Sequence, residues 1–115
     1  MKDKIEATIN IKPISTNRLY QGRRYRTKNY KDWMDFAIIS TPKKKMIKDK
    51  VSVFLDFYYR YAARSDIDNF LKGVLDMLCK KGWIEDDRFI YFLQVRKFIV
   101  KTEKEEKIKV KIVKL

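Results

Sequence analysis

The stretch from Arg64 to Asp87 reads RSDIDNFLKGVLDMLCKKGWIEDD, and we expect the rest of the chain to be arranged around it. Its apolar residues recur at three- and four-residue spacing, which is typical of a helix with one buried face. These residues are Ile67, Phe70, Leu71, Val74, Leu75 and Leu78. Lys80 and Lys81 occupy the expected last turn, and Gly82 is the residue type that ends helices in the left-handed conformation. The spacing therefore predicts an amphipathic helix that stops at Gly82.

Carboxylates gather at both ends of this predicted helix. Asp66 and Asp68 precede it, and Asp86 and Asp87 follow it, although the protein carries a formal net charge of +13. The polar residues in between recur at four-residue steps and therefore share one face of the helix. That stripe consists of Asp68, Lys72, Asp76 and Lys80. A basic protein that concentrates acid here suggests a metal site that faces a polyanion.

Length and composition limit the possible classes of protein. A chain of 115 residues with 45% hydrophobic residues predicts one folded domain over residues 1–115. No segment approaches the ~20 apolar residues of a membrane span, and the charged, alternating N-terminal segment is not a signal peptide. Cys79 is the only cysteine, which excludes an internal disulfide framework and favours a cytoplasmic location. Because the chain has no histidine, His-based zinc sites and Ser-His or Cys-His triads are also excluded.

The net charge favours nucleic acid as the partner. A pI near 9.8 indicates either nucleic acid or an anionic membrane surface. A membrane-bound protein would need a basic amphipathic helix with a wide apolar face. Here the apolar residues are spread over several segments with core-like periods, so we expect nucleic acid and no membrane.

The segment from Ser15 to Lys31 is the predicted contact surface for that nucleic acid. It contains no acidic residue, and its basic residues alternate with tyrosines. Guanidinium groups bind phosphates and tyrosines stack on unpaired bases, whereas the alternative is an ordinary solvated loop. The candidate contacts are Arg18, Tyr20, Arg23, Arg24, Tyr25, Arg26 and Lys28.

The order of the remaining segments predicts an α+β domain with a mixed β-sheet and two main helices, in the order β-α-β-α-β-β. Apolar alternation marks the strands, and a helical stripe around Trp33 precedes Pro42, which blocks its extension. The strand beginning at Val51 has apolar residues on both faces, so we expect it to be central and covered on both sides. The last two strands are expected to form an antiparallel hairpin. The predicted strands are Lys4–Lys12, Val51–Tyr61, Phe89–Val100 and Lys107–Leu115.

The acidic residues allow two interpretations. Asp-x-Asp-Asn before a helix is common as simple capping. An EF-hand loop starting at Asp66 is excluded, because its glycine position is Leu71 and its bidentate glutamate position is Met77. If Asp66, Asp68 and Asp87 converge at one edge of the sheet, their oxygen-only donor set favours Mg²⁺ or Mn²⁺.

Two patterns resemble the RusA family of Holliday junction resolvases. The first is Asp66-x-Asp68-Asn69-x-x-Lys72, followed by Asp76 and by Gly82-Trp83-x-x-Asp86-Asp87. The second is Pro13-x-Ser15-x-Asn17-Arg18-x-Tyr20 with Gly22-Arg23-Arg24 after it, which is similar to the family's basic loop. The resemblance implies a homodimeric, Mg²⁺-dependent endodeoxyribonuclease that nicks four-way DNA junctions symmetrically, with Mn²⁺ as a substitute. It also implies that Asp66, Asp68 and Asp87 bind the metal and that Lys72 is catalytic.

Several alternatives remain open at this point. The chain is either such a nuclease, a nuclease that prefers flaps or forks, or a non-catalytic basic module that binds nucleic acid. Within the nuclease interpretation the site holds one or two metals, and Lys72 either stabilises charge on the phosphate or positions the water. Asp76 either orients Lys72 or forms an ordinary helix ion pair. Asn69 and Asp86 are expected to support the ligands from outside, unless Asp86 caps a turn.

Overall fold

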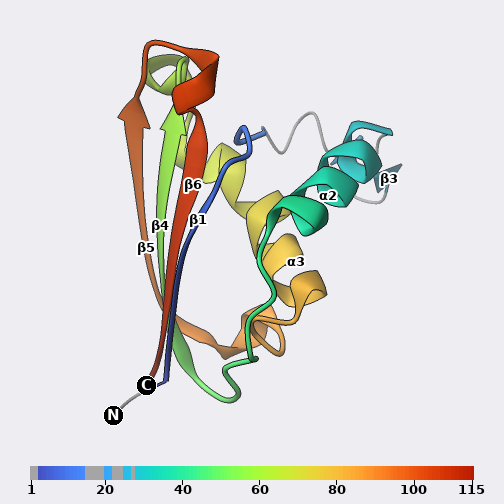
Figure 1. The fold of residues 1–115 in the computed structure, drawn as a ribbon, viewed down its shortest axis with the longest axis vertical. Helices are drawn as coiled ribbons and strands as arrows, with labels where there is room; N and C mark the ends of the chain where they lie inside the picture. The colour runs from blue at the N-terminus through green and yellow to red at the C-terminus, as the bar shows by residue number, and fades with distance from the viewer. Residues whose placement is uncertain (1–2, 15–19, 22–24, 27) are drawn as a thin grey trace.

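The computed structural model describes residues 3–14, 20–21, 25–26 and 28–115 (Figure 1). Its two main helices are α2 (Lys28–Ser40) and α3 (Leu71–Lys81). The main strands are β1 (Lys4–Ile9), β4 (Val51–Tyr59), β5 (Ile90–Ile99) and β6 (Lys107–Lys114). Two further strands, β2 (Tyr20–Gln21) and β3 (Tyr25–Arg26), pair with one another. The order of the main elements is the predicted β-α-β-α-β-β.

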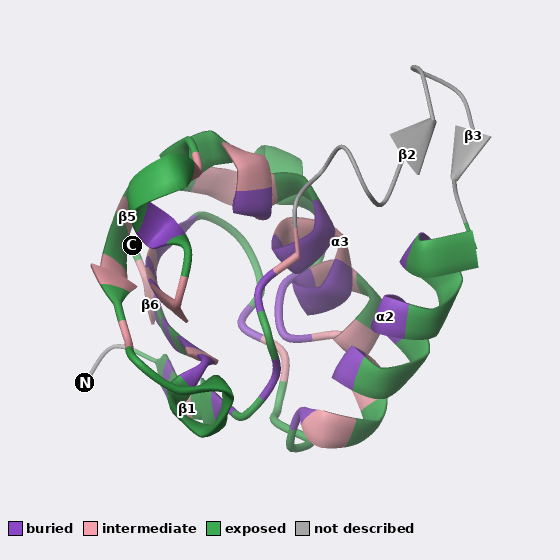
Figure 2. Cartoon of the chain, turned by 90° about the horizontal axis from the view of Figure 1, so that it is seen from above, coloured by how far each residue is buried: buried purple, intermediate pink, exposed green. Residues whose placement is uncertain are grey.

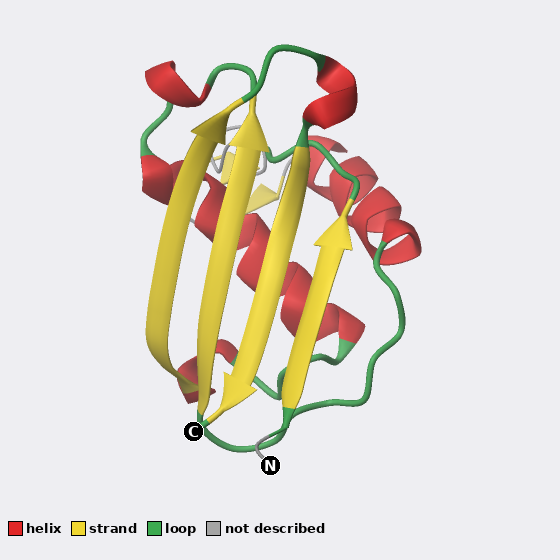
Figure 3. Ribbon diagram, turned by 60° about the vertical axis from the view of Figure 1, so that its left-hand side comes forward, coloured by secondary structure: helices red, strands yellow, loops and turns green. Residues whose placement is uncertain are grey.

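The four main strands form one mixed sheet in the order β1-β6-β4-β5 (Figure 3). β4 pairs with β5 in parallel and with β6 in antiparallel orientation, and β6 also pairs with β1 in antiparallel orientation. The connection from β4 to β5 contains α3, as a parallel pair requires. The sequence therefore predicted the fold class and the mixed character of the sheet correctly.

The predicted hairpin between the last two strands is wrong. β5 and β6 run in opposite directions, but β4 lies between them. The β4-α3-β5 unit occupies one side of β4, so β6 takes the other side, where β1 also flanks it. The connection from β5 contains the short turn η4 (Glu103–Glu105), which Thr102 caps together with Glu105. This central position suits β6, because its apolar residues are buried: Ile108, Val110 and Ile112.

Among the described residues, helices cover only one face of the sheet (Figure 2). On that face Val53, Leu55 and Phe57 of β4 are fully buried. On the other face Phe54 and Tyr58 are half-buried, so the expectation that β4 is covered on both sides is wrong, although β4 is central as predicted. These rings are shielded instead by lysine side chains of β6, a cation–π arrangement: Lys107 and Lys109 lie over Tyr58, and Lys111 lies over Phe54.

The central helix α3 packs against α2, and its buried apolar residues belong to the same core as those of the sheet. Phe70, Val74 and Leu78 are buried as predicted, and Met77 is buried as well. Gly82 ends the helix with a φ of 80°, in the left-handed region that favours glycine. Ile67 departs from the prediction, because the chain enters the helix through a 3₁₀ turn that leaves this side chain 40% exposed.

Trp83 and Ile84 cover the end of α3, and both are fully buried. The Trp83 indole N–H donates to the backbone oxygen of Pro42, which ties the helix end to the segment after α2. None of the helices in the described part of the chain is long and apolar enough to cross a membrane.

Candidate active site

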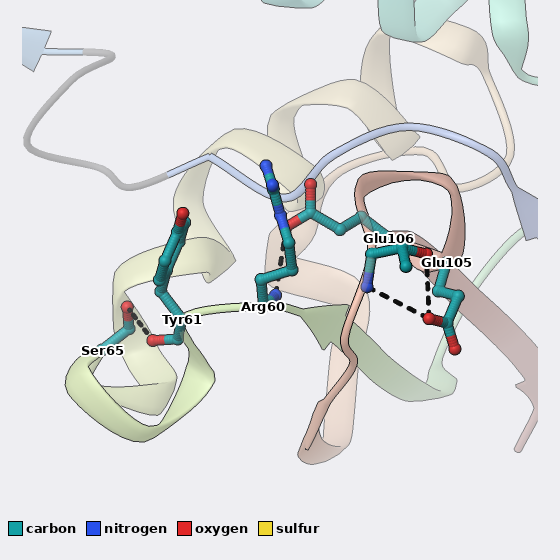
Figure 4. Close-up of polar contacts among 6 residues, drawn as sticks. Arg60, Tyr61, Ser65, Glu105 and Glu106 are labelled. Atoms are coloured by element: carbon teal, nitrogen blue, oxygen red, sulfur yellow. Dashed lines mark hydrogen bonds and ion pairs between the residues drawn. The ribbon is translucent and has the colours of Figure 1, made fainter.

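The turn that leads from β4 to the acidic residues is held by local hydrogen bonds. The chain leaves β4 through the short turn η1 (Ala62–Arg64) and reaches Asp66 in an extended conformation. Ser65 Oγ donates to the backbone oxygen of Tyr61 at 3.2 Å (Figure 4). Lys97 of β5 donates from Nζ to the backbone oxygens of Ala62 at 2.7 Å and Ser65 at 2.8 Å. Through Lys97, β5 therefore holds the segment that leads to Asp66 and Asp68.

A buried carboxylate fixes the end of β4 just before this turn. The side chain of Glu106 is only 1% exposed, and its Oε2 accepts from the backbone N–H of Arg60 at 3.1 Å (Figure 4). The Arg60 guanidinium Nε lies 3.5 Å from the same oxygen. A buried charge needs such a partner, so this pair locks the start of the site segment to the beginning of β6.

Asp66 and Asp68 do not serve as caps of α3. Asp66 is the residue before the 3₁₀ turn η2 (Ile67–Phe70), and its side chain makes no capping hydrogen bond. The cap position of α3 itself is Phe70. Both aspartates are exposed at the surface. The geometry thus disfavours the simple capping interpretation that the sequence left open.

A surface pocket of about 470 Å³ brings most of the polar stripe together with Asp87. We call it the acid pocket; it is lined by Asp68, Asn69, Leu71, Lys72, Leu75, Asp76 and Asp87. The first six of these residues come from η2 and α3, and Asp87 begins η3 (Asp87–Phe89) just before β5. Lys80, the fourth member of the predicted stripe, lines a separate hollow beside α2. Asp66 is not part of the lining.

The two acids at the start of η3 are electrostatically coupled. Hydrogen bonding of its carboxyl group to the Asp86 carboxylate, partial burial and the nearby charges of Asp86 and Asp76 raise the pKa of Asp87 above its ordinary value. The pKa of Asp86 is lowered, first because its carboxylate accepts from the Arg88 backbone N–H at 3.1 Å and then because of its bond with Asp87. Asp86 therefore caps this turn, one of the two roles expected for it.

The environment of Cys79 gives a second indication of this concentration of negative charge. Burial raises the pKa of its thiol first, and the charges of Asp87, Asp86 and Asp76 raise it further. These acids thus converge on one region although they come from two segments of the chain. The negative potential that they create would be relieved by a cation.

The donor set of the acid pocket suits a hard divalent cation. It offers the carboxylates of Asp68, Asp76 and Asp87 and the amide of Asn69, all of which supply oxygen ligands. Within the described residues, however, no group of three or more acidic or thiol side chains is gathered closely enough to form a ready metal cage. The candidate ligands therefore line one pocket, and a metal would have to bring their oxygen atoms closer together.

Most of the predicted DNA contacts lie outside what the structure describes. Arg18, Arg23 and Arg24 are outside the described residues, and the side chains of Tyr20, Tyr25 and Arg26 are not described either, although β2 and β3 include their backbones. Lys28 is exposed at the first position of α2.

Sequence reasoning missed Glu106, Lys97 and Cys79 as neighbours of the site. For Lys97 the signal was its position on an apolar strand, because a cation there needs a nearby hydrogen-bond acceptor. Glu106 stands in the polar run TEKEE, where nothing distinguishes it from its exposed neighbours. Cys79 follows Asp76 by three residues on the helix, and that spacing does place the two side by side.

The comparison with known proteins identifies the family of the chain. The family model for endodeoxyribonuclease RusA matches residues 10–113, which includes the acid pocket, both main helices, β4, β5 and all of β6 but its last residue, and which begins just after β1. No curated protein matches the chain. The matched region spans most of the sequence, so the chain belongs to the RusA family of endodeoxyribonucleases, the Holliday junction resolvases of DNA recombination and repair.

Proposed function

We propose that this protein is a cytoplasmic, homodimeric, Mg²⁺-dependent enzyme that nicks four-way DNA junctions at paired, symmetric positions. Asp66, Asp68 and Asp87 bind the metal, for which Mn²⁺ can substitute, and Lys72 is the catalytic cation. The observation that carries the proposal is the acid pocket, where Asp68, Lys72 and Asp87 meet although they come from two separate segments.

The acids and the lysine divide the work of phosphodiester hydrolysis. A bound divalent metal would bind the scissile phosphate, activate the attacking water and stabilise the leaving oxygen. The carboxylates of Asp68 and Asp87 hold the cation and offset its charge. Lys72, one turn into the helix from Asp68, brings a positive charge to the phosphate side of the same pocket. There it stabilises the charge that develops in the transition state.

Asp66 reaches the metal by a local adjustment of the chain. It stands two positions before Asp68, in an extended conformation, with no capping bond to hold its side chain elsewhere. Ligand groups often tighten only when the reactants are bound. Metal binding would therefore draw Asp66 toward Asp68 at small cost, because both are exposed.

Three further residues support these ligands. Asp76 lines the pocket one helical turn after Lys72 and raises the pKa of Asp87, so it contributes both an orienting charge for the lysine and negative potential for the metal. Asn69 lines the same pocket next to Asp68. Asp86 caps the turn that begins at Asp87, and its carboxylate raises the pKa of Asp87.

The basic segment before α2 supplies the DNA-binding charge. We propose that Arg18, Arg23, Arg24, Arg26 and Lys28 contact phosphates and that Tyr20 and Tyr25 stack on bases. In a chain of net charge +13, the acid pocket is an exception to an otherwise cationic protein. The metal would remove the repulsion between that pocket and the DNA backbone.

The test compares single-turnover cleavage with binding on one synthetic four-way junction. Without metal, Asp66→Asn, Asp68→Asn and Asp87→Asn should each bind the junction as well as the unmodified protein or slightly better, because these carboxylates then repel the DNA phosphates. In Mg²⁺ and in Mn²⁺ each variant should cut the junction orders of magnitude more slowly. Lys72→Ala should bind and lose roughly 10²–10³-fold in rate. Asp32→Asn is the matched control, since Asp32 is an exposed aspartate on α2 away from the acid pocket.

The outcome that would refute the mechanism is near-normal cleavage by Asp68→Asn or Asp87→Asn. Cleavage of flaps or forks at a higher rate than junctions, at equal concentrations, would refute the substrate assignment alone. Labelling each of the four strands in turn tests the symmetry, because paired nicks must appear on two opposing strands.

A further inference from the structure

The face of the main sheet opposite the helices, which we call the open face, carries aromatic side chains in two pairs (Figure 3). Phe54 of β4 lies beside Phe92 of β5, with 5.6 Å between the ring centroids. Tyr58 of β4 is stacked on Phe98 of β5 at 4.9 Å. Phe92 is 49% exposed, and the other rings are half-buried. The open face therefore presents flat apolar surfaces to solvent.

Cationic side chains of β6 lie against these rings. The ammonium nitrogen of Lys111 lies 5.5 Å from the centre of the Phe54 ring. Those of Lys107 and Lys109 lie 5.0 Å and 5.3 Å from the centre of the Tyr58 ring. Such contacts are weak at exposed sites, so these ammonium groups can turn toward an incoming phosphate while their stems stay on the apolar surface.

The acids of the open face are paired within the subunit. Asp56 forms a bidentate pair with Arg96, with both N–O distances at 2.8 Å. The Glu6 carboxylate lies 3.4 Å from the Lys4 ammonium and 3.9 Å from that of Lys111. Cations still outnumber acids among the residues that the four main strands place on this face: Lys4, Arg96, Lys107, Lys109 and Lys111 against Glu6 and Asp56. The open face is therefore net positive.

A hollow of about 670 Å³ lies over the middle of the open face. Charged and aromatic groups share its wall with Thr8 and Gln94, which can donate and accept hydrogen bonds. The residues that line it are Glu6, Ala7, Thr8, Phe54, Asp56, Gln94, Arg96, Lys109, Val110 and Lys111. None of them lines the acid pocket. The hollow is thus a separate surface feature, distinct from the candidate active site.

We propose that the open face binds single-stranded DNA at a second site, separate from the acid pocket. The lysines of β6 bind phosphates, and unpaired bases stack on the rings beside them, a combination that holds single strands with little sequence preference. Phe54 and Tyr58 are four residues apart on β4, which corresponds to roughly 13 Å along a strand. One continuous DNA strand can therefore contact both aromatic pairs.

The chemistry of the open face favours this occupant over others. Lysines alone would suit any polyanion, but exposed rings next to them favour one that carries flat aromatic groups. Duplex DNA would reach the lysines through its phosphates, while its paired bases could not stack on the rings. A second copy of this chain would bring two net positive faces together in a desolvated contact, which is costly. The inference does not depend on cleavage and so goes beyond the proposed function.

The first test measures the binding of a fluorescein-labelled oligothymidine of about 15 nucleotides by fluorescence anisotropy in EDTA. Phe92→Leu keeps an apolar side chain but removes the flat ring, so affinity should fall roughly 5-fold or more. Phe92→Tyr keeps a ring and should bind like the unmodified protein. Because Phe92 is half-exposed on the edge strand β5, both variants should keep the fold, which circular dichroism checks.

The second test concerns the lysines. Lys109→Gln/Lys111→Gln removes two exposed cations of the open face. The slope of log affinity for oligothymidine against log salt should become shallower by about 1.4, because each phosphate contact of a single strand contributes about 0.7. Lys44→Gln/Lys45→Gln is the matched control: it makes the same change in net charge on the exposed segment between α2 and β4 and should leave the slope unchanged.

Several results would overturn the proposal. These are no binding of oligothymidine, equal affinity of Phe92→Leu and Phe92→Tyr, or the same salt slope for both lysine double variants. Displacement of the oligonucleotide by polyglutamate at equal charge would assign the face to acidic proteins, and tighter binding of oligouridine would assign it to RNA. A lower sedimenting mass of Lys109→Gln/Lys111→Gln alone would assign it to a second copy. A protein that binds oligothymidine as expected but fails to cut junctions would refute only the proposed function.

Discussion

The carboxyl groups of Asp86 and Asp87 interact with one another, and their pKa values move in opposite directions. Asp86 also accepts the backbone N–H of Arg88, which stabilises its ionised form. Asp87 faces Asp86 and Asp76, so its ionised form is disfavoured. Of the two, Asp87, the residue that we propose as a metal ligand, therefore takes up a proton more readily.

Removing the charge of Asp86 should lower the pKa of Asp87. In the Asp86→Asn variant, the hydrogen-bonding and charge effects that raise the pKa of Asp87 are weakened, and only partial burial and Asp76 still oppose ionisation. The carboxyl carbon resonance of Asp87 should then titrate closer to the pH of an ordinary aspartate. A carbon NMR titration of both proteins without metal measures this, and an unchanged or higher pKa would contradict the coupling.

The same shift predicts how metal binding depends on pH. Metal and proton compete for Asp87, so Mn²⁺ affinity should fall as the pH is lowered through its raised pKa, earlier than for an ordinary aspartate. For stability the signs are opposite: the raised pKa of Asp87 favours the fold at low pH and this contribution is lost as the pH rises through that pKa. The lowered pKa of Asp86 favours the fold above its unfolded-state value and is lost in acid. Calorimetric Mn²⁺ titrations at several pH values test the first statement.

Cys79 provides a chemical reporter for the acid pocket. Burial and three neighbouring carboxylates raise the pKa of its thiol, so it should react slowly with iodoacetamide at neutral pH. A divalent cation bound to these acids would offset their charges but not the burial. Addition of Mg²⁺ should therefore accelerate alkylation in the folded protein, as long as the ion does not cover the sulfur.

The control for the Cys79 experiment is the same reaction in the Asp87→Asn variant, where the thiol should react faster without metal and respond less to Mg²⁺. Equal alkylation rates with and without saturating Mg²⁺ in the unmodified protein would argue against a cation near Asp76, Asp86 and Asp87.

Local patterns in the sequence predicted the central helix and its termination well, and the non-local arrangement of the strands poorly. Gly82 and the spacing of Phe70, Val74 and Leu78 depend on contacts within a few residues, and the structure confirms them. The predicted hairpin was wrong because the position of β6 depends on which side of β4 is already occupied by β5. The alternation of apolar residues indicates that a segment is a strand, but it does not determine which strands pair with it.

At the candidate site, too, local features were predictable from the sequence and non-local contacts were not. The polar stripe of α3 follows from helical spacing, and its convergence with Asp87 follows from the return of the chain to the sheet edge. The anchoring of the preceding turn by Lys97 depends on the parallel pairing of β4 with β5 and is not visible in the sequence. The position of Asp66 outside the pocket lining likewise depends on the 3₁₀ turn that replaces the expected first turn of the helix.

Junction affinity should depend steeply on salt. If the basic segment and its neighbours neutralise about six phosphates, affinity should fall roughly 10³-fold between about 50 and 200 mM salt. Arg23→Ala and Arg24→Ala should each flatten the logarithmic slope by close to one phosphate contact. Fluorescence anisotropy in EDTA measures this without cleavage, with Lys101→Ala as a control, since Lys101 is an exposed lysine beyond the end of β5. Affinity that is indifferent to salt would remove the electrostatic basis of binding.

The contact between Glu106 and Arg60 should stabilise both the fold and the entrance to the site. Glu106→Ala removes the acceptor of the Arg60 backbone N–H and leaves the guanidinium without its buried partner. Unfolding in urea should show a loss of about 1–3 kcal/mol in the free energy of unfolding. Glu106→Gln should recover part of this loss, because its amide oxygen can still accept from the backbone N–H, whereas Glu103→Ala, an exposed neighbour, should stay within about 0.5 kcal/mol of the unmodified protein. A Glu106→Ala variant as stable as the Glu103→Ala control would show that this buried pair contributes nothing net to the fold, as some buried ion pairs do.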